Sequence, residues 1–138
     1  MRMLRQQVDA VMAEVADPLD GIAAGIRAYL AFFAEHPEYV ELLIQERAQF
    51  KDRKKPTYFE HREANAARWQ AFWRDLIAQG RVREMPVERI FQVVGDLLYG
   101  TMFTNYFAGP QKPVETQAQD ILDIVYHGIL SDAERNKL

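Results

Sequence analysis

The chain has 138 residues and no cysteine, and its 17 Lys and Arg face 20 Asp and Glu, so the formal net charge is −3. The length and the 49% hydrophobic content predict one globular domain, 1–138, rather than a disordered chain. Without cysteine, disulfides, thiolate catalysis and cysteine-ligated metal sites are excluded, and the net acidity argues against direct binding of nucleic acid.

The first half of the chain predicts three helices from apolar periodicity and from residues that start or stop helices. The first spans 2–15. The second spans 18–35, because Asp17 can cap the helix and Pro18 suits its first position. His36-Pro37 then interrupts the chain, and the third helix runs from 37 to about 50.

Three more helices are predicted in the second half. The fourth, 56–79, carries an aromatic face and ends at Gly80. The fifth starts at Pro86 and stops at Gly109-Pro110, and the sixth spans 114–130. No segment alternates like a strand, so the sequence predicts an all-α fold of six helices.

The last two helices are apolar around most of their circumference, as in helices that are buried on more than one side. They could simply form the core. Alternatively, they pair with the same helices of a second subunit, giving a two-fold dimer through 87–130, with Gly95, Gly100 and Gly128 permitting close approach. The predicted interface residues are Phe91, Val94, Leu98, Tyr106, Ile121, Leu122, Val125 and Ile129.

Aromatic residues gather on the second, fourth and fifth helices, where large flat side chains either fill a core or enclose an apolar ligand pocket. The predicted pocket consists of Tyr29, Phe33, Phe59, Arg62, Asn65, Trp69, Phe72, Trp73, Tyr99, Met102 and Phe103. Asp96 lies among apolar neighbours in the sequence and should have an ionic partner if it is buried. Arg47, Arg62 and Arg89 are the candidate partners. Alternatively, Asp96 contacts a ligand.

Catalysis has no support in the sequence. The three histidines are far apart, and no nucleophile elbow, phosphate loop or metal-binding motif occurs. We therefore expect no enzyme activity, no catalytic residue, no metal and no cofactor. No apolar run approaches the ~20 residues that cross a bilayer, and the first residues lack a signal peptide, so we expect a cytoplasmic protein without a membrane partner.

Four stretches, in this order along the chain, resemble the C-terminal regulatory domain of TetR-type bacterial transcriptional repressors. They are Tyr29 to Phe33 with His36-Pro37-Glu38, Trp69 with Leu76 to Arg83, Leu97 to Thr101, and Ile121 to Leu130. The resemblance covers nearly the whole chain. It implies a homodimer formed by the last two helices and a pocket for a small hydrophobic effector, whose binding changes the spacing of attached DNA-binding modules.

The helix-turn-helix module of that family does not occur in this sequence, so 1–16 would be the helix that links to it. Either the module lies upstream of Met1, or the protein lacks it. Two functions follow: an effector-sensing domain of a transcription regulator, or a helical dimerisation partner that binds neither ligand nor DNA. The first predicts an apolar cavity and the second a filled core.

Overall fold

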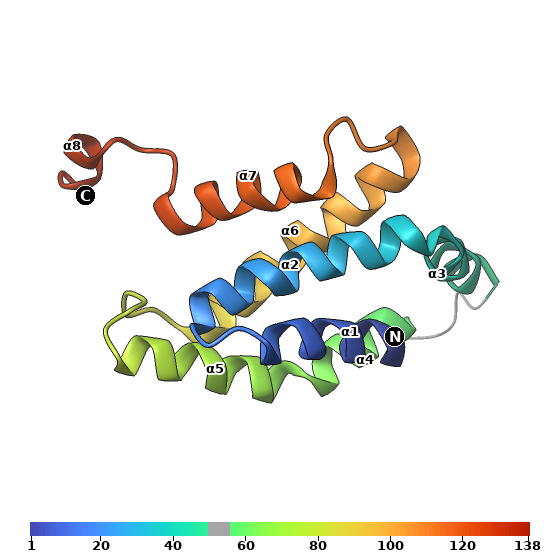
Figure 1. Ribbon diagram of the computed structural model, residues 1–138, viewed down its shortest axis with the longest axis horizontal. Helices are drawn as coiled ribbons and strands as arrows, with labels where there is room; N and C mark the ends of the chain where they lie inside the picture. Colours follow the sequence, from blue (N-terminus) through green and yellow to red (C-terminus); the bar gives the residue numbers. More distant parts are fainter. Residues whose placement is uncertain (50–55) are drawn as a thin grey trace.

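The computed structural model describes residues 1–49 and 56–138, and in these residues every regular element is a helix (Figure 1). The all-α fold predicted from periodicity is therefore confirmed. The helices are α1 (Arg2–Ala13), α2 (Pro18–Glu35), α3 (Pro37–Gln49), α4 (Thr57–Ala64), α5 (Ala66–Ala78), α6 (Val87–Ala108), α7 (Val114–His127) and α8 (Asp132–Arg135).

The predicted count of six helices is too low, because one predicted helix is divided in two and α8 was not predicted; the first predicted helix, over 2–15, also ends earlier, at Ala13. The predicted helix over 56–79 is two helices, because Asn65 adopts φ −100° and ψ −1° between α4 and α5. The predicted helix over 114–130 ends at His127, because Gly128 has a φ of +74°. Residue 50, the predicted end of the third helix, lies outside the described residues.

The start of α2 follows the predicted capping mechanism. The Asp17 carboxylate accepts a hydrogen bond from the Leu19 N–H at 2.9 Å, and Pro18 occupies the first position. The same carboxylate also accepts two hydrogen bonds from the Arg81 guanidinium, at 2.8 and 3.0 Å. These Arg81 hydrogen bonds and that from Leu19 lower the pKa of Asp17 below its ordinary value. One side chain thus caps α2 and fixes the connector between α5 and α6.

We expect Asp17→Ala to lower the melting temperature by a few degrees at pH 7. Because the folded pKa lies below the ordinary value of 3.8, the carboxylate stabilises the fold above that pH, and this contribution is lost as pH falls through the folded pKa. Melting curves at several pH values should therefore show the two proteins converging in acid. Asp20→Ala, in the same helical turn, is the control; a gap that stays constant down to pH 2 would contradict this account.

The core consists of two clusters, and α2 contributes to both. The first core cluster is Ile22, Ile26, Leu30, Trp73, Leu76, Val87 and Ala118. The second core cluster is Leu4, Phe32, Phe33, Val40, Tyr58 and Met102. The first core cluster therefore joins α2 to α5, α7 and the start of α6, and the second joins α2 to α1, α3, α4 and α6.

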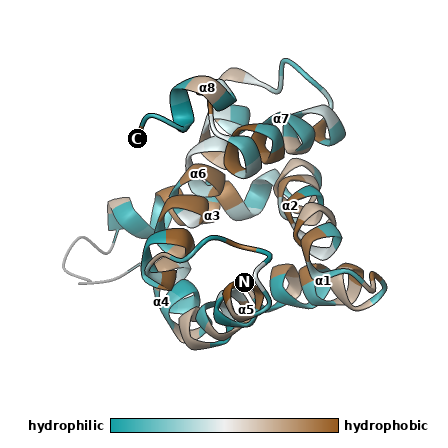
Figure 2. Ribbon diagram, turned by 90° about the vertical axis from the view of Figure 1, so that its left-hand side faces the viewer, coloured by the Kyte–Doolittle hydropathy of each residue, from teal (hydrophilic) through white to brown (hydrophobic). Residues whose placement is uncertain are grey.

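Helix α7 lies against α2, outside the ring that α1, α2, α4, α5 and α6 form in the end-on view of Figure 2. The Tyr126 hydroxyl donates to the Leu19 carbonyl at 3.0 Å, and the side-chain amides of Asn105 and Gln117 exchange hydrogen bonds of 2.8 and 2.9 Å. These contacts join α7 to α2 and to the end of α6. None of the described helices has the length and apolar character needed to cross a membrane.

Candidate functional site: an apolar cavity beneath α1

A cavity of about 180 Å³ lies where the two core clusters meet, and five helices line it. Its walls are mostly apolar: Leu4, Val8 and Met12 of α1 face Ile22 and Ile26 of α2, with Trp69 and Trp73 of α5 beside them. Gly25 brings α1 and α2 close, since a Cβ there would lie 3.1 Å from the Met12 sulfur. Helix α1 packs mainly on α2, and Val8 and Met12, which lie against Gly25, also line the cavity.

The cavity brings together five of the eleven residues predicted to form a pocket: Tyr29, Arg62, Asn65, Trp69 and Trp73. The other six belong to the surrounding core. Phe33 and Met102 are buried in the second core cluster, and Phe59, Tyr99 and Phe103 pack against it. Phe72 packs against the first core cluster, with its ring 5.5 Å from that of Trp69 and 5.6 Å from that of Trp73.

The lining residues of α1 were not predicted as pocket residues. They are Leu4, Arg5, Val8, Asp9 and Met12. Their apolar members form the stripe that identified the first helix, but a stripe at helical spacing does not indicate which neighbour it meets. Helix α1 is therefore a wall of the cavity as well as a candidate linker.

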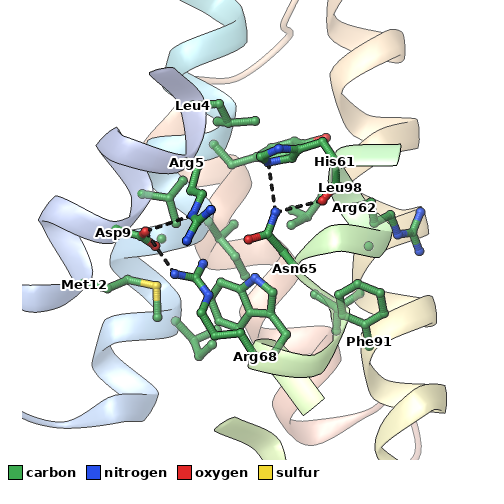
Figure 3. A pocket seen from close by; sticks show the side chains of 18 of the residues that line it. Leu4, Arg5, Asp9, Met12, His61, Arg62, Asn65, Arg68, Phe91 and Leu98 are labelled. Carbon is green, nitrogen blue, oxygen red and sulfur yellow. Dashed lines mark hydrogen bonds and ion pairs between the residues drawn. The ribbon is translucent and has the colours of Figure 1, made fainter. Parts of the chain in front are cut away.

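Asn65 is a buried polar residue of the site, with 8% of its surface exposed. Its Nδ2 donates to the His61 carbonyl at 2.8 Å and lies 3.4 Å from His61 Nε2. Its Oδ1 accepts no hydrogen bond from any residue that the structure describes, and it points away from His61 toward α1 (Figure 3). A polar ligand group that donates a hydrogen bond would satisfy this oxygen.

A second polar group is the pair of Tyr29 and Tyr58, whose hydroxyls hydrogen-bond to each other. Burial raises the pKa of Tyr58 to about 12 and that of Tyr29 well above its ordinary value. Both phenols are therefore neutral at physiological pH. Since one hydroxyl proton makes the mutual bond, the second remains available to a ligand that accepts a hydrogen bond.

Arg62 forms the wall beside α6 and is held rigidly. Its Nη1 lies 2.9 Å from Asp96 Oδ1, its Nη2 donates to the Gln92 carbonyl at 3.1 Å, and its guanidinium lies 5.5 Å from the centre of the Phe91 ring. Arg62 is thus the ionic partner of Asp96, although 61% of the Asp96 side chain is exposed. A Cβ at position 95 would approach Arg62 Nη2 to 2.6 Å, so Gly95 makes room for this guanidinium.

Gly100 and Gly128, which were also predicted to permit close approach of helices, do not allow a close contact with another helix within the described residues. Gly100 has no described atom within 4 Å of its would-be Cβ, and Gly128 provides the left-handed backbone that ends α7.

Charged side chains of α1, α4 and α5 form the rim of the cavity. Asp9 Oδ2 lies 3.0 Å from Arg68 Nη1 and 3.6 Å from Arg5 Nε, so one carboxylate oxygen faces two guanidinium groups (Figure 3). His61 lies beside them, and its pKa is lowered by burial and then by the positive charges of the N-terminus, Arg5 and Arg68. The rim therefore carries a positive local potential.

The eight residues predicted for a subunit interface fall into three groups. Phe91, Val94 and Leu98 line the cavity, so their side chains face the interior of this chain. Ile121 and Leu122 pack against the first core cluster, and Tyr106 packs against the second and donates a hydrogen bond to Glu41. Val125 and Ile129 are exposed, as are further apolar residues of the α6–α7 region: Val93, Phe107, Ile124, Tyr126 and Leu130.

Comparison with models of known protein families, with curated proteins and with solved structures finds no significant match. Among residues 1–49 and 56–138, no group of three or more His, Asp or Glu side chains could hold a metal ion. The fold and the site together define an all-α chain with an apolar cavity that has a positively charged rim.

Proposed function

We propose that the chain is the effector-sensing domain of a transcription regulator of the TetR type, with a small, mostly apolar molecule bound in the cavity beneath α1. The cavity itself is the observation that carries the proposal, because a dimerisation partner without a ligand would be expected to have a filled core. The free Oδ1 of Asn65 and the spare hydroxyl proton of the Tyr29–Tyr58 pair give a ligand two specific polar contacts.

The size of the cavity restricts the ligand. An apolar cavity of about 150 Å³ holds one benzene molecule, whereas pockets for drug-sized ligands span roughly 300 to 1,000 Å³. With about 180 Å³, this cavity suits a body the size of a single ring. The aromatic side chains of Trp69 and Trp73 provide flat surfaces against which such a ring can pack.

Helix α1 is the element through which the ligand would act. It contributes five lining residues and packs mainly on α2, so a ligand that prefers one position of α1 shifts the equilibrium toward that position. A DNA-binding module attached to α1 would then change its spacing in a dimer. The exposed apolar residues of α6 and α7, among them Val93, Phe107 and Ile124, support a homodimer, because contact with a second subunit would remove them from water.

Titration of the protein with toluene and benzamide, followed by the fluorescence of Trp69 and Trp73, tests the proposal. We expect a saturable change, because both indoles line the cavity. Cyclohexanol and other ring-sized compounds extend the panel. If no compound of this size produces a saturable change, the proposal of a ligand sensor fails, and a dimerisation partner without a ligand becomes the better account.

A further inference from the structure

The cavity combines an apolar interior with an excess of positive charge at its rim. Of the charged residues that line it, Arg62 is already paired with Asp96. The remaining arginines, Arg5 and Arg68, share the single carboxylate of Asp9. The rim therefore has one positive charge more than it has negative charges, on a chain whose net charge is −3.

The two rim arginines have unused hydrogen-bond donors. Arg68 donates only from Nη1 to Asp9, at 3.0 Å, and Arg5 approaches the same oxygen at 3.6 Å without a hydrogen bond; neither makes another hydrogen bond to the described part of the chain. A guanidinium has five N–H donors in a planar fork that matches a carboxylate. Arg68 is also held in place, with its guanidinium 5.3 Å from the centre of the Trp69 ring.

The contact of Asp9 with Arg68 joins α1 to α5 across the rim. The side chains involved are roughly 40% exposed, so this ion pair contributes little to stability and can be exchanged at low cost. A ligand carboxylate that reaches Arg68 would compete directly with Asp9. Its binding would remove the ionic link between α1 and α5.

We propose that the cavity takes a small monocarboxylate whose apolar body is about one ring in size, and that the ligand carboxylate replaces Asp9 at Arg68 and Arg5. This inference rests on the proposed function and specifies its ligand and its coupling to α1. The apolar walls hold the ring, and the rim arginines select the anion. Release of Asp9 frees α1 from α5, which is the movement that a sensor requires.

The test compares benzoate with benzamide, which has the same shape but no charge, in the full chain. We expect benzoate to bind about 10-fold more tightly than benzamide at low salt, because charge-assisted hydrogen bonds to arginine are the stronger ones. Arg68→Gln should remove this preference, because the variant should lose about 10-fold more affinity for benzoate than for benzamide. Arg74→Gln, which changes an exposed arginine of the same helix, should keep the preference.

Asp9→Asn provides an independent arm that leaves both rim arginines intact. Removal of the competing carboxylate should raise benzoate affinity about 3- to 10-fold more than it changes benzamide affinity, as expected when an internal competitor for the anion is lost. Circular dichroism melts confirm that each variant is folded. If Arg68→Gln does not fold, the Asp9→Asn comparison still decides the question.

Three results would overturn the inference: equal binding of benzoate and benzamide, a preference for benzoate that survives Arg68→Gln, or a preference for benzoate that Asp9→Asn does not increase. In each of these cases benzamide still binds, so the proposed sensor function survives while the carboxylate assignment fails. If none of benzoate, benzamide and toluene binds, both proposals are contradicted.

Discussion

Val94→Trp is expected to lower the affinity for benzamide and for benzoate by at least about 100-fold, equivalent to about 2.7 kcal/mol, in a protein that remains folded. Val94 lines the cavity from α6, and an indole there would occupy the space that a ring-sized ligand needs. Overpacking normally costs about 1 to 3 kcal/mol, but here part of the added volume enters an existing void. Fluorescence titration measures the affinity, and a urea melt measures the stability.

Gln92→Trp is the matched control, because it adds the same side chain to an exposed position on the same helix. The ligand affinity of Gln92→Trp should stay within about 2-fold of that of the unmodified protein, a change well below the ~1.4 kcal/mol that corresponds to a 10-fold change in affinity. Undiminished binding to the folded Val94→Trp variant would show that the ligand occupies a different place.

The double variant Phe107→Glu and Ile124→Glu is expected to convert a dimer into a monomer at micromolar concentration. Phe107 and Ile124 are 70% and 48% exposed and lie on α6 and α7, the two helices proposed to pair across a two-fold axis. Burying unpaired carboxylates in an apolar interface should weaken the dimer by at least about 100-fold, since an uncompensated buried charge costs several kcal/mol. Light scattering coupled to size exclusion measures the mass.

Leu42→Glu is the control for that experiment. Leu42 is 56% exposed on α3, outside the proposed interface, so the variant should have the same mass as the unmodified protein. A monomeric unmodified protein at micromolar concentration would contradict the dimer directly, and a double variant that stays dimeric would place the interface elsewhere.

The helices were predictable because each has a local signal. Asp17-Pro18 and His36-Pro37 mark starts and breaks, and both occur in the structure at the expected positions. The break at Asn65 was missed, because asparagine inside an aromatic helical pattern is a weak breaker. In the structure its N–H is shared between the His61 and Arg62 carbonyls. This interruption separates α4 from α5 within the cavity wall.

The cavity was only partly predictable, because apolar periodicity indicates which face of a helix is buried but not which other helix that face packs against. Trp69 and Trp73 both line the cavity, whereas Phe72, which packs against the same first core cluster, does not. The rim is a product of tertiary structure: Asp9 and Arg68 are 59 residues apart and meet only because α1 lies beside α5. No local pattern could have paired them.

Methyl-resolved NMR of the full chain during titration with toluene, benzamide and benzoate shows directly where these ligands bind. We expect saturable chemical-shift changes, at one ligand per chain, for the cavity methyl groups of Val8, Met12 and Ile26, and unchanged shifts for the exposed methyl groups of Val93 and Ile129. Shifts that never saturate, or that occur only at the exposed methyl groups, would contradict a ligand site beneath α1.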